Sequence, residues 1–238
     1  MPIPTIVAVG AITSGTGALT IALPTGWIRN DILIAIIATA NQNPSPNPAT
    51  NWNIVSNPPT GFGSAGLSGG LKLHVWWKRA EVGEGTLAFA DSGDMQIGRM
   101  IAIRGCRGGD PWDASGTSNT TSAGTAVSWP DITTLTANSL IIGALGGDRD
   151  VASTADMSAV TNTNLASITD RMENWVLAGT GGGIYMFTGT NAATGAIGAS
   201  TGTITSQVFS LWIGALAGND PSLLPHAPPA QMAPLLCM

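Results

Sequence analysis

The stretch Asn30-Asp31-Ile32-Leu33-Ile34-Ala35-Ile36-Ile37-Ala38 decides the fold of this chain. It is a short apolar run, rich in β-branched residues and opened by turn-prone polar residues, which is typical of a buried strand. Its apolar side chains would occupy both faces of that strand, whereas the outer face of a two-layer sheet is usually polar. We therefore expect either a loop or another subunit to cover the outer face.

The same pattern returns 108 residues later as Asn138-Ser139-Leu140-Ile141-Ile142-Gly143-Ala144-Leu145. Two further pairs of segments echo each other at offsets of 111 and 110 residues: Leu73–Trp76 with Ile184–Phe187, and Met100–Ile103 with Ser210–Ile213. This near-constant spacing predicts an internal repeat, in which the same β architecture occurs twice in the chain. The repeated halves span about 30–104 and 138–216, joined by a polar link over 105–131.

Composition points to many turns and few long helices, because the 238 residues include 31 glycines and 15 prolines. The length is sufficient to bury a sizeable core. Together with the strand patterns, this predicts an all-β protein: a two-sheet antiparallel β-sandwich over residues 1–217, followed by an extended arm over 218–238.

Charged residues make up only 10% of the chain, against about 25% in an ordinary domain. A free monomer usually carries more charge to stay in solution. The deficit favours a homo-oligomer, with a trimer as the working hypothesis, in which neighbouring subunits cover much of the surface.

The sequence contains no features typical of a nucleic-acid-binding, membrane-spanning or secreted disulfide-rich protein. The formal net charge is −5, and the longest cluster of basic residues is Lys78-Arg79, so we expect no nucleic-acid partner. Apolar runs stay below the ~18 residues of a membrane span, and the N-terminus lacks signal-peptide features. Cys106 and Cys237 form no disulfide framework, which favours free thiols in a chain made in a reducing cytoplasm.

The segment Leu71–Arg79 alternates cleanly. Its odd-numbered residues would face the core, and Lys72, His74, Trp76 and Lys78 would face the other way. Trp76 is a large aromatic among polar neighbours, as in a contact surface. We predict that His74 and Trp76 belong to an interface.

Residues 219–238 differ from the rest of the chain. Five prolines in twenty residues forbid regular structure. Fully extended, this arm would reach roughly 60 Å at about 3.1 Å per residue. We interpret it as a segment that binds a neighbouring subunit, and we name five of its residues as interface candidates: Pro225, Pro228, Pro229, Leu235 and Leu236.

Reactive groups are scarce, so we expect no enzyme, no cofactor and no metal. The two histidines are His74 and His226, and no nucleophile elbow, Cys-x-x-Cys or His-Glu-x-x-His pattern occurs. Gly179–Gly183 lacks the Lys-Ser/Thr of a phosphate loop and is interpreted as a hairpin connection. The eight tryptophans are interpreted as core or interface anchors, with a sugar-stacking platform as the alternative.

Four carboxylate pairs could serve glycoside hydrolysis or calcium binding, but each sits in a glycine-rich turn. Aspartate is common in such turns because its oxygens accept backbone N–H groups. We favour this turn role for all four, with Asp148 and Asp150 the first choice if one pair binds Ca²⁺. The pairs are Glu81 with Glu84, Asp91 with Asp94, Asp110 with Asp113, and Asp148 with Asp150.

Three motifs carry a resemblance to a known family: Pro24-Thr25-Gly26-Trp27 followed by Asp31-Ile32-Leu33; Val75-Trp76-Trp77-Lys78-Arg79-Ala80; and Ile103-Arg104-Gly105 leading to Asp110-Pro111-Trp112-Asp113-Ala114. On these motifs the chain resembles jelly-roll virion proteins of tailed bacteriophages, of the capsid cement or tail-appendage type. The resemblance covers roughly residues 3–217 and implies a jelly-roll-like β-sandwich that packs on coat subunits without catalysis.

These observations lead to one main functional hypothesis and two alternatives. The first is a structural virion protein that cements or decorates a phage capsid, packs as an oligomer on the major capsid protein and lies at the capsid surface. The runner-up is a tail-fibre or receptor-binding domain that recognises host glycans, with Trp76 and the loops Asn41–Pro48 and Asn57–Gly70 at its tip. The third is a carbohydrate-active enzyme, which needs two converging carboxylates.

Overall fold

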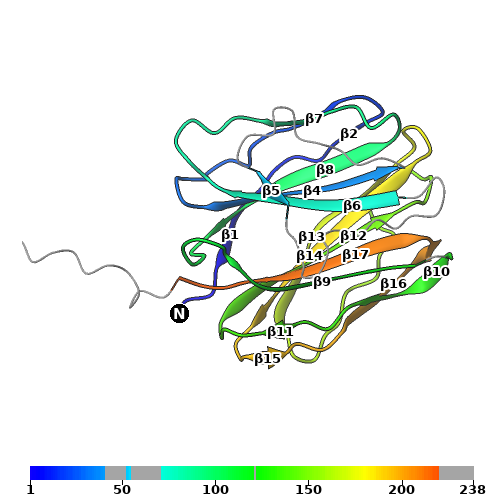
Figure 1. The fold of residues 1–238 in the computed structure, drawn as a ribbon. Coiled ribbons are helices and arrows are strands. Elements are labelled where there is room, and N and C mark those ends of the chain that lie inside the picture. The colour runs from blue at the N-terminus through cyan, green and yellow to red at the C-terminus, as the bar shows by residue number, and fades with distance from the viewer. Residues whose placement is uncertain (41–51, 55–70, 121, 220–238) are drawn as a thin grey trace, which may run out of the picture.

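The computed structural model describes residues 1–40, 52–54, 71–120 and 122–219 (Figure 1). In these residues every regular element is a β-strand, so the all-β prediction is confirmed. The strands of the first half are β1 Thr5–Val9, β2 Thr13–Gly15, β3 Leu19–Ile21, β4 Ile32–Ala40, β5 Asn53–Ile54, β6 Leu71–Arg79, β7 Leu87–Phe89 and β8 Gln96–Arg104. Those of the second half are β9 Trp112–Asn119, β10 Gly124–Trp129, β11 Thr133–Thr134, β12 Ser139–Gly147, β13 Ala166–Val176, β14 Gly182–Asn191, β15 Gly195–Ala196, β16 Ser200–Gln207 and β17 Phe209–Leu216.

Two large antiparallel sheets have matching strand orders. The first is β1-β8-β4-β6-β5, with β2 also paired to β8, and the second is β9-β17-β12-β14-β13. Each half therefore centres on its apolar run, β4 or β12. The flanking strands β6 and β14, and likewise β8 and β17, contain the segments that echo each other in the sequence. The jelly-roll type is not confirmed, since each large sheet draws its strands from one half of the chain.

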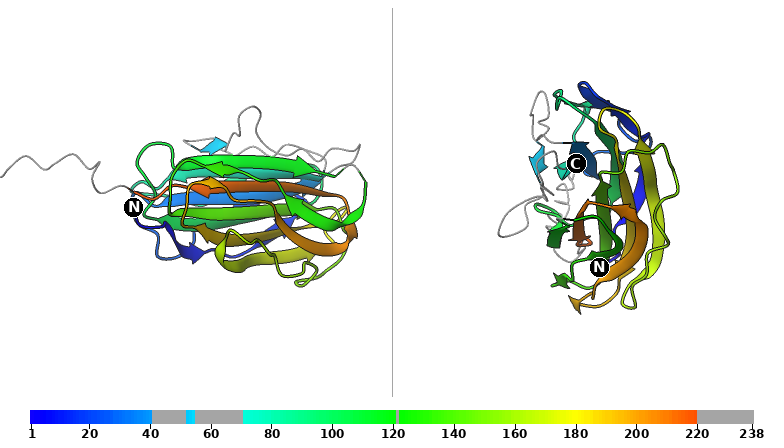
Figure 2. Two further views of the ribbon diagram at one scale, coloured as in Figure 1. Left: turned by 90° about the horizontal axis from the view of Figure 1, so that it is seen from below. Right: turned by 90° about the vertical axis from the view of Figure 1, so that its right-hand side faces the viewer.

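The two sheets lie against each other as layers, and their strands run in similar directions (Figures 1 and 2). One apolar cluster fills the space between them. It joins Ile34 and Ile36 of β4 and Val75 of β6 to Met186 of β14 and Trp212 of β17, all of them at most 1% exposed. Burial of apolar area at about 25 cal/mol per Å² makes this shared core the main force holding the sheets together.

The outer face of each sheet is covered by the chain itself. On the first sheet, Leu33, Ala35 and Ile37 pack beneath the β3–β7 ladder, which contributes Ile21 and Phe89. On the second sheet, β10–β16 and β11–β15 supply the corresponding cover. The cover expected for the outer face of β4 was a loop or another subunit, and the cover found is a two-stranded ladder of the same chain.

An asparagine opens each central strand in a left-handed conformation, with φ of 74° at Asn30 and 60° at Asn138. Asparagine tolerates this region better than other residues with a side chain, because its short polar group bonds locally. The backbone N–H of Asn30 bonds the Ala80 carbonyl at 2.9 Å. Each asparagine thus turns the chain sharply into the core strand that follows it.

The prediction that residues 105–131 form only a polar link between the halves is wrong in part. Trp112–Asn119 forms β9, which pairs with β17 as an edge strand, and Gly124–Trp129 forms β10. An edge strand that is half exposed needs few apolar residues, so the Ser- and Thr-rich sequence of β9 did not indicate a strand. In β10 the burial of Val127 and Trp129 alternates with exposed residues.

The two described ends of the chain meet at one end of the molecule. Asn219 donates its backbone N–H to the Gly105 carbonyl at 2.8 Å, and Cys106 bridges to Gly218. A side chain at Gly218 would lie 2.0 Å from the Pro2 carbonyl oxygen, so glycine is required by this close approach. The arm candidates Pro225, Pro228, Pro229, Leu235 and Leu236 lie outside the described residues.

Candidate functional site

The face of β6 that was expected to meet a partner is covered within the chain. His74 is 6% exposed, and Trp76 is half-buried with its ring 6.5 Å from Phe89 of β7 in an edge-on contact. The alternation was predicted correctly, and Trp76 packs against the cluster that contains Phe89 of the β3–β7 ladder. The interface role of His74 and Trp76 stays a prediction. Burial lowers the pKa of His74 to about 4, with a smaller contribution from the charge of Lys72.

The tryptophans do not form an exposed sugar-stacking platform. All eight lie in the described residues, and none is fully exposed. Trp129, Trp175 and Trp212 are buried, and the other five are half-buried. Trp129 packs edge-on against Phe187 at 5.0 Å, and Trp212 packs edge-on against Trp112 at 5.4 Å. They act as core anchors, as the composition suggested.

The predicted turn carboxylates bond backbone amides. The Asp91 carboxylate accepts the Gly93 N–H at 2.7 Å, and Asp113 accepts the N–H groups of Leu135 and Thr136 at 2.7 and 2.9 Å. The remaining pairs show the same use: Glu84 accepts from Glu81, Asp94 from Met95 and Thr180, Asp110 from Trp112, and Asp148 from Val208. The contacts of Asp91, Asp110 and Glu84 are local and support the turn interpretation, whereas those of Asp94 with Thr180, Asp113 and Asp148 join segments that are distant in the sequence.

The glycine-rich run 179–183 connects β13 to β14, so the hairpin interpretation is confirmed. Gly179 and Gly181 have φ of 60° and 73°, which glycine adopts without strain. Asp94, from the turn before β8, accepts the Thr180 N–H at 2.8 Å and its hydroxyl at 2.9 Å. The hairpin therefore ties the second sheet to the first.

A polar cluster on the second sheet was not foreseen. Asp156 pairs with Arg149 and accepts the Thr205 hydroxyl at 2.7 Å. Glu173 accepts the backbone N–H groups of Asp156 and Met157. The pKa of Glu173 is raised, mainly because the carboxyl group is partly buried. Because Glu173 Oε1 is occupied by two backbone amides, the cluster holds the segment before β13 against the sheet. Its members are far apart in the sequence, so no local motif could reveal it.

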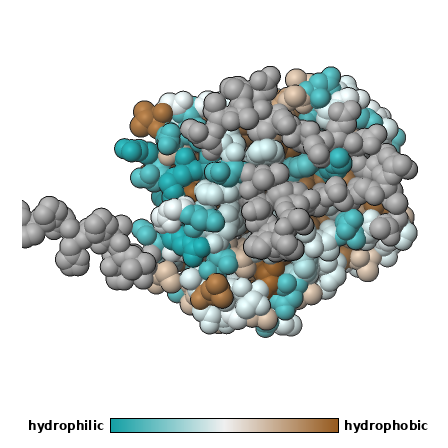
Figure 3. All heavy atoms as spheres, in the orientation of Figure 1, coloured by the Kyte–Doolittle hydropathy of each residue, from teal (hydrophilic) through white to brown (hydrophobic). Residues whose placement is uncertain are grey.

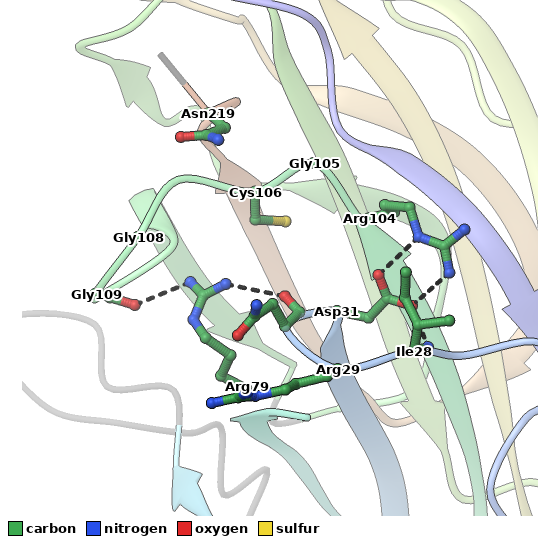
Figure 4. Close-up of a pocket in the computed structure, with 11 residues that line it drawn as sticks. Ile28, Arg29, Asp31, Arg79, Arg104, Gly105, Cys106, Gly108, Gly109 and Asn219 are labelled. Carbon is green, nitrogen blue, oxygen red and sulfur yellow. Dashed lines mark hydrogen bonds and ion pairs between the residues drawn. The ribbon is translucent and has the colours of Figure 1, made fainter. Parts of the chain in front are cut away.

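A polar cavity lies at the end of the molecule where the two described ends of the chain meet (Figure 4). Its volume is about 380 Å³. We call it the arginine pocket, after the three arginines in its lining: Ile28, Arg29, Asn30, Asp31, Arg79, Arg104, Gly105, Cys106, Gly108, Gly109 and Asn219. The start of β4, the end of β6 and the turn after β8 bring these residues together.

Two of the arginines are held by specific contacts. Arg104 donates its Nε–H and Nη2–H to the two oxygens of the Asp31 carboxylate, at 2.9 and 2.8 Å. Arg79 donates to three backbone carbonyls, those of Asn30, Arg107 and Gly109. The Cys106 thiol in the same lining is only 8% exposed, and burial raises its pKa to about 12. At neutral pH it is a neutral thiol, which is a poor nucleophile.

Within the described residues, no group of three or more His, Cys, Asp or Glu side chains is arranged to hold a metal ion. The same residues contain no helix that is long and apolar enough to cross a membrane. The chain matches no family model, no curated protein and no solved structure.

Proposed function

We propose that this chain is a structural virion protein of a tailed bacteriophage, without catalytic activity. It would cement or decorate the capsid surface as a homo-oligomer, with a trimer as the first candidate, packed on the major capsid protein. The resemblance described above suggests this class and its jelly-roll-like sandwich. The two facing sheets are compatible with a sandwich.

One observation carries the proposal: the two described ends of the chain lie together at one end of the molecule. Asn219 is bonded to Gly105, and Gly218 lies against Pro2. The remaining nineteen residues, 220–238, continue from this point. A proline-spaced segment starting there would reach roughly 60 Å if extended, enough to contact an adjacent subunit. This end suits attachment to a larger assembly, and a second point of attachment adds avidity.

The physical basis for self-association needs a correction. The apolar faces of β4 and β12 are buried within the chain, so they do not require a partner. On the side of the molecule that Figure 3 displays, the described surface has isolated hydrophobic side chains among hydrophilic ones. The support for an oligomer therefore rests on the low charge content and on the arm.

The direct test is a deletion of residues 220–238, which keeps the Asn219–Gly105 hydrogen bond. We expect the truncated protein to fold with an unchanged melting temperature and to lose particle association in a co-sedimentation assay with purified capsids. Full retention on particles would refute the role of the arm. A count of copies per virion by quantitative mass spectrometry tests the location, since hundreds of copies indicate the head and a few dozen indicate the tail.

The alternative is a tail-fibre or receptor-binding domain that recognises host glycans. It is favoured by the position of Ala40 and Leu71, which form the last pair of the β4–β6 ladder. The first pair of that ladder is Ile32 with Arg79, and Arg79 lines the arginine pocket, so Ala40 and Leu71 lie at the opposite end of the ladder. In the segment between Ala40 and Leu71, the described strand β5 pairs with β6 at Trp76 and Trp77. The predicted loops Asn41–Pro48 and Asn57–Gly70 belong to this segment and lie outside the described residues. Binding to host cells that is lost when these loops are shortened would favour this alternative.

A further inference from the structure

The arginine pocket carries positive charge on a chain that is acidic as a whole. Its lining contains Arg29, Arg79 and Arg104 but a single carboxylate, Asp31. The formal net charge of the chain is −5, so this local excess opposes the general composition. Figure 4 shows these side chains around the same hollow.

The one carboxylate is already neutralised. Arg104 engages both oxygens of Asp31, and the backbone N–H of Ile28 donates to the same carboxylate at 2.8 Å. Such a bidentate pair is the strongest form of guanidinium–carboxylate contact. The charges of Arg29 and Arg79 are therefore left without an anionic partner in the pocket.

Arg79 is positioned but not neutralised. Its three carbonyl partners, at Asn30, Arg107 and Gly109, hold the guanidinium in place without cancelling its charge. These contacts use three of the five N–H groups of an arginine, which leaves the Nε–H and one Nη1–H available. A guanidinium fixed in this way loses little side-chain entropy when it binds a ligand.

Arg29 is exposed, and among the described residues no hydrogen bond or ion pair is assigned to it. It follows Ile28, whose backbone is fixed by Asp31, so the base of the side chain is positioned while its end is free to move. Two like charges lining one cavity repel each other, and a bound anion relieves this repulsion.

We propose that the arginine pocket is an oxyanion-binding site, in which Arg29 and Arg79 bind a phosphate or carboxylate group. Planar guanidinium groups match both groups through paired N–H···O contacts. The volume of about 380 Å³ accommodates a ligand as large as a small phosphorylated or carboxylated molecule. The site is independent of the proposed virion role, because its lining ends at Asn219, before the residues 220–238 that the truncation removes, and because it needs no capsid.

Isothermal titration calorimetry of the full chain at low ionic strength tests the proposal, with inorganic phosphate and acetate as separate probes. We expect saturable binding of at least one probe, accompanied by a rise in melting temperature. Arg29→Gln should weaken that binding about tenfold or more, the loss expected for one charge-assisted contact. Arg29→Lys, which keeps the charge but not the paired geometry, should retain part of the affinity. Because Arg29 is exposed, neither substitution disturbs the fold.

The matched control is Arg171→Gln on β13, which removes the same charge outside the lining of the arginine pocket. It should leave binding unchanged. An equal loss in both variants would mean that general electrostatic attraction accounts for the binding, and the proposal would be overturned. Absence of saturable binding of both probes to the unsubstituted protein would also overturn it.

The two probes distinguish the source of the oxyanion. Preference for phosphate identifies a phosphorylated ligand, and preference for acetate identifies a carboxylated one. Either preference supports the site only if it disappears in Arg29→Gln. Loss of capsid association on deletion of 220–238 tests a different part of the molecule, so the two proposals succeed or fail separately.

Discussion

The Asp31 carboxylate and the Arg104 guanidinium form a bidentate ion pair, with N···O distances of 2.9 and 2.8 Å. Asp31 precedes β4 and has a side chain that is 2% exposed, whereas Arg104 ends β8 with a side chain that is 43% exposed. The pair closes the end of the β4–β8 ladder beside the pair Ile32–Ile103. It joins the stretch that decides the fold to a strand more than seventy residues away.

Asp31→Asn should therefore destabilise the protein. The substitution leaves Arg104 without its ionic partner and weakens the acceptor for the Ile28 N–H. A buried hydrogen-bonded charge contributes about 1–3 kcal/mol, so we expect a loss in this range in urea unfolding followed by tryptophan fluorescence. Glu81→Gln, at an exposed side chain, is the control and should change stability by less than about 0.5 kcal/mol. Equal stabilities for both variants would contradict the prediction.

Gly143→Ala tests the packing of the second sheet. A Cβ at Gly143 would lie 2.0 Å from the ring of Phe187, its cross-strand partner. Phe187 is held in turn by Trp129, so the ring has no room to withdraw. Overpacking of this kind costs about 1–3 kcal/mol, which should appear as a lower melting temperature. Gly124→Ala is the matched control, because nothing lies within 4 Å of its Cβ position. A smaller effect at Gly143 than at Gly124 would refute the packing argument.

The tie between the two halves of the chain is tested by Asp94→Ala. Asp94 accepts hydrogen bonds from the Thr180 N–H and hydroxyl. The pKa of the Asp94 carboxyl is lowered, mainly by the hydrogen bond from the backbone N–H of Thr180. We expect faster hydrogen exchange at the Thr180 amide, by about tenfold. Thr180→Ser retains both donors and should behave as the unsubstituted protein. In the unsubstituted protein, protection of this amide should persist above the ordinary pKa of aspartate and fall as the pH drops through the lowered value.

His74 should make stability depend on pH. Its folded-state pKa of about 4 lies below the ordinary value of 6.5, so the unfolded chain binds the proton more readily. Stability is therefore complete above pH 6.5 and falls as the pH drops towards 4, by roughly 3 kcal/mol at about 1.4 kcal/mol per pKa unit.

Urea unfolding at a series of pH values checks this dependence. His74→Phe should flatten the profile between these limits, because the titrating group is gone. His226→Gln removes the second histidine of the chain and should leave the profile as it is. A profile that is flattened only by His226→Gln would contradict the assignment to His74.

Cys106 should be almost inert to alkylation in the native protein. Its thiol is 8% exposed, and burial raises its pKa to about 12. In a Cys237→Ser background, we expect iodoacetamide to react roughly a thousandfold more slowly than with the urea-unfolded chain, as followed by mass spectrometry. Rapid labelling under native conditions would show that the turn after β8 opens readily.

The amino-acid pattern alone was sufficient to predict the central strands. The run after Asn30, its echo after Asn138 and the alternation in Leu71–Arg79 each predicted a strand that the structure contains. Local patterns suffice there, because a buried strand is recognised from its own apolar residues. The local part of the carboxylate interpretation has the same reason, since Asp91, Asp110 and Glu84 accept backbone amides two or three residues away, whereas the amides bonded by Asp113 and Asp148 lie far along the chain. The edge strand β9 escaped this reasoning, because a half-exposed edge leaves little trace in hydropathy.

Only the tertiary structure decided what covers the strands and where charges meet. The sequence of β4 showed that both faces are apolar, but the cover could have been a loop or a subunit, and the β3–β7 ladder supplied it from two distant segments. The arginine pocket likewise joins Arg29, Arg79 and Arg104 from three separate elements. Neither feature has a local signature. Apolar packing and pairing of charges act through space, and the chain brings these residues together only when both sheets are complete.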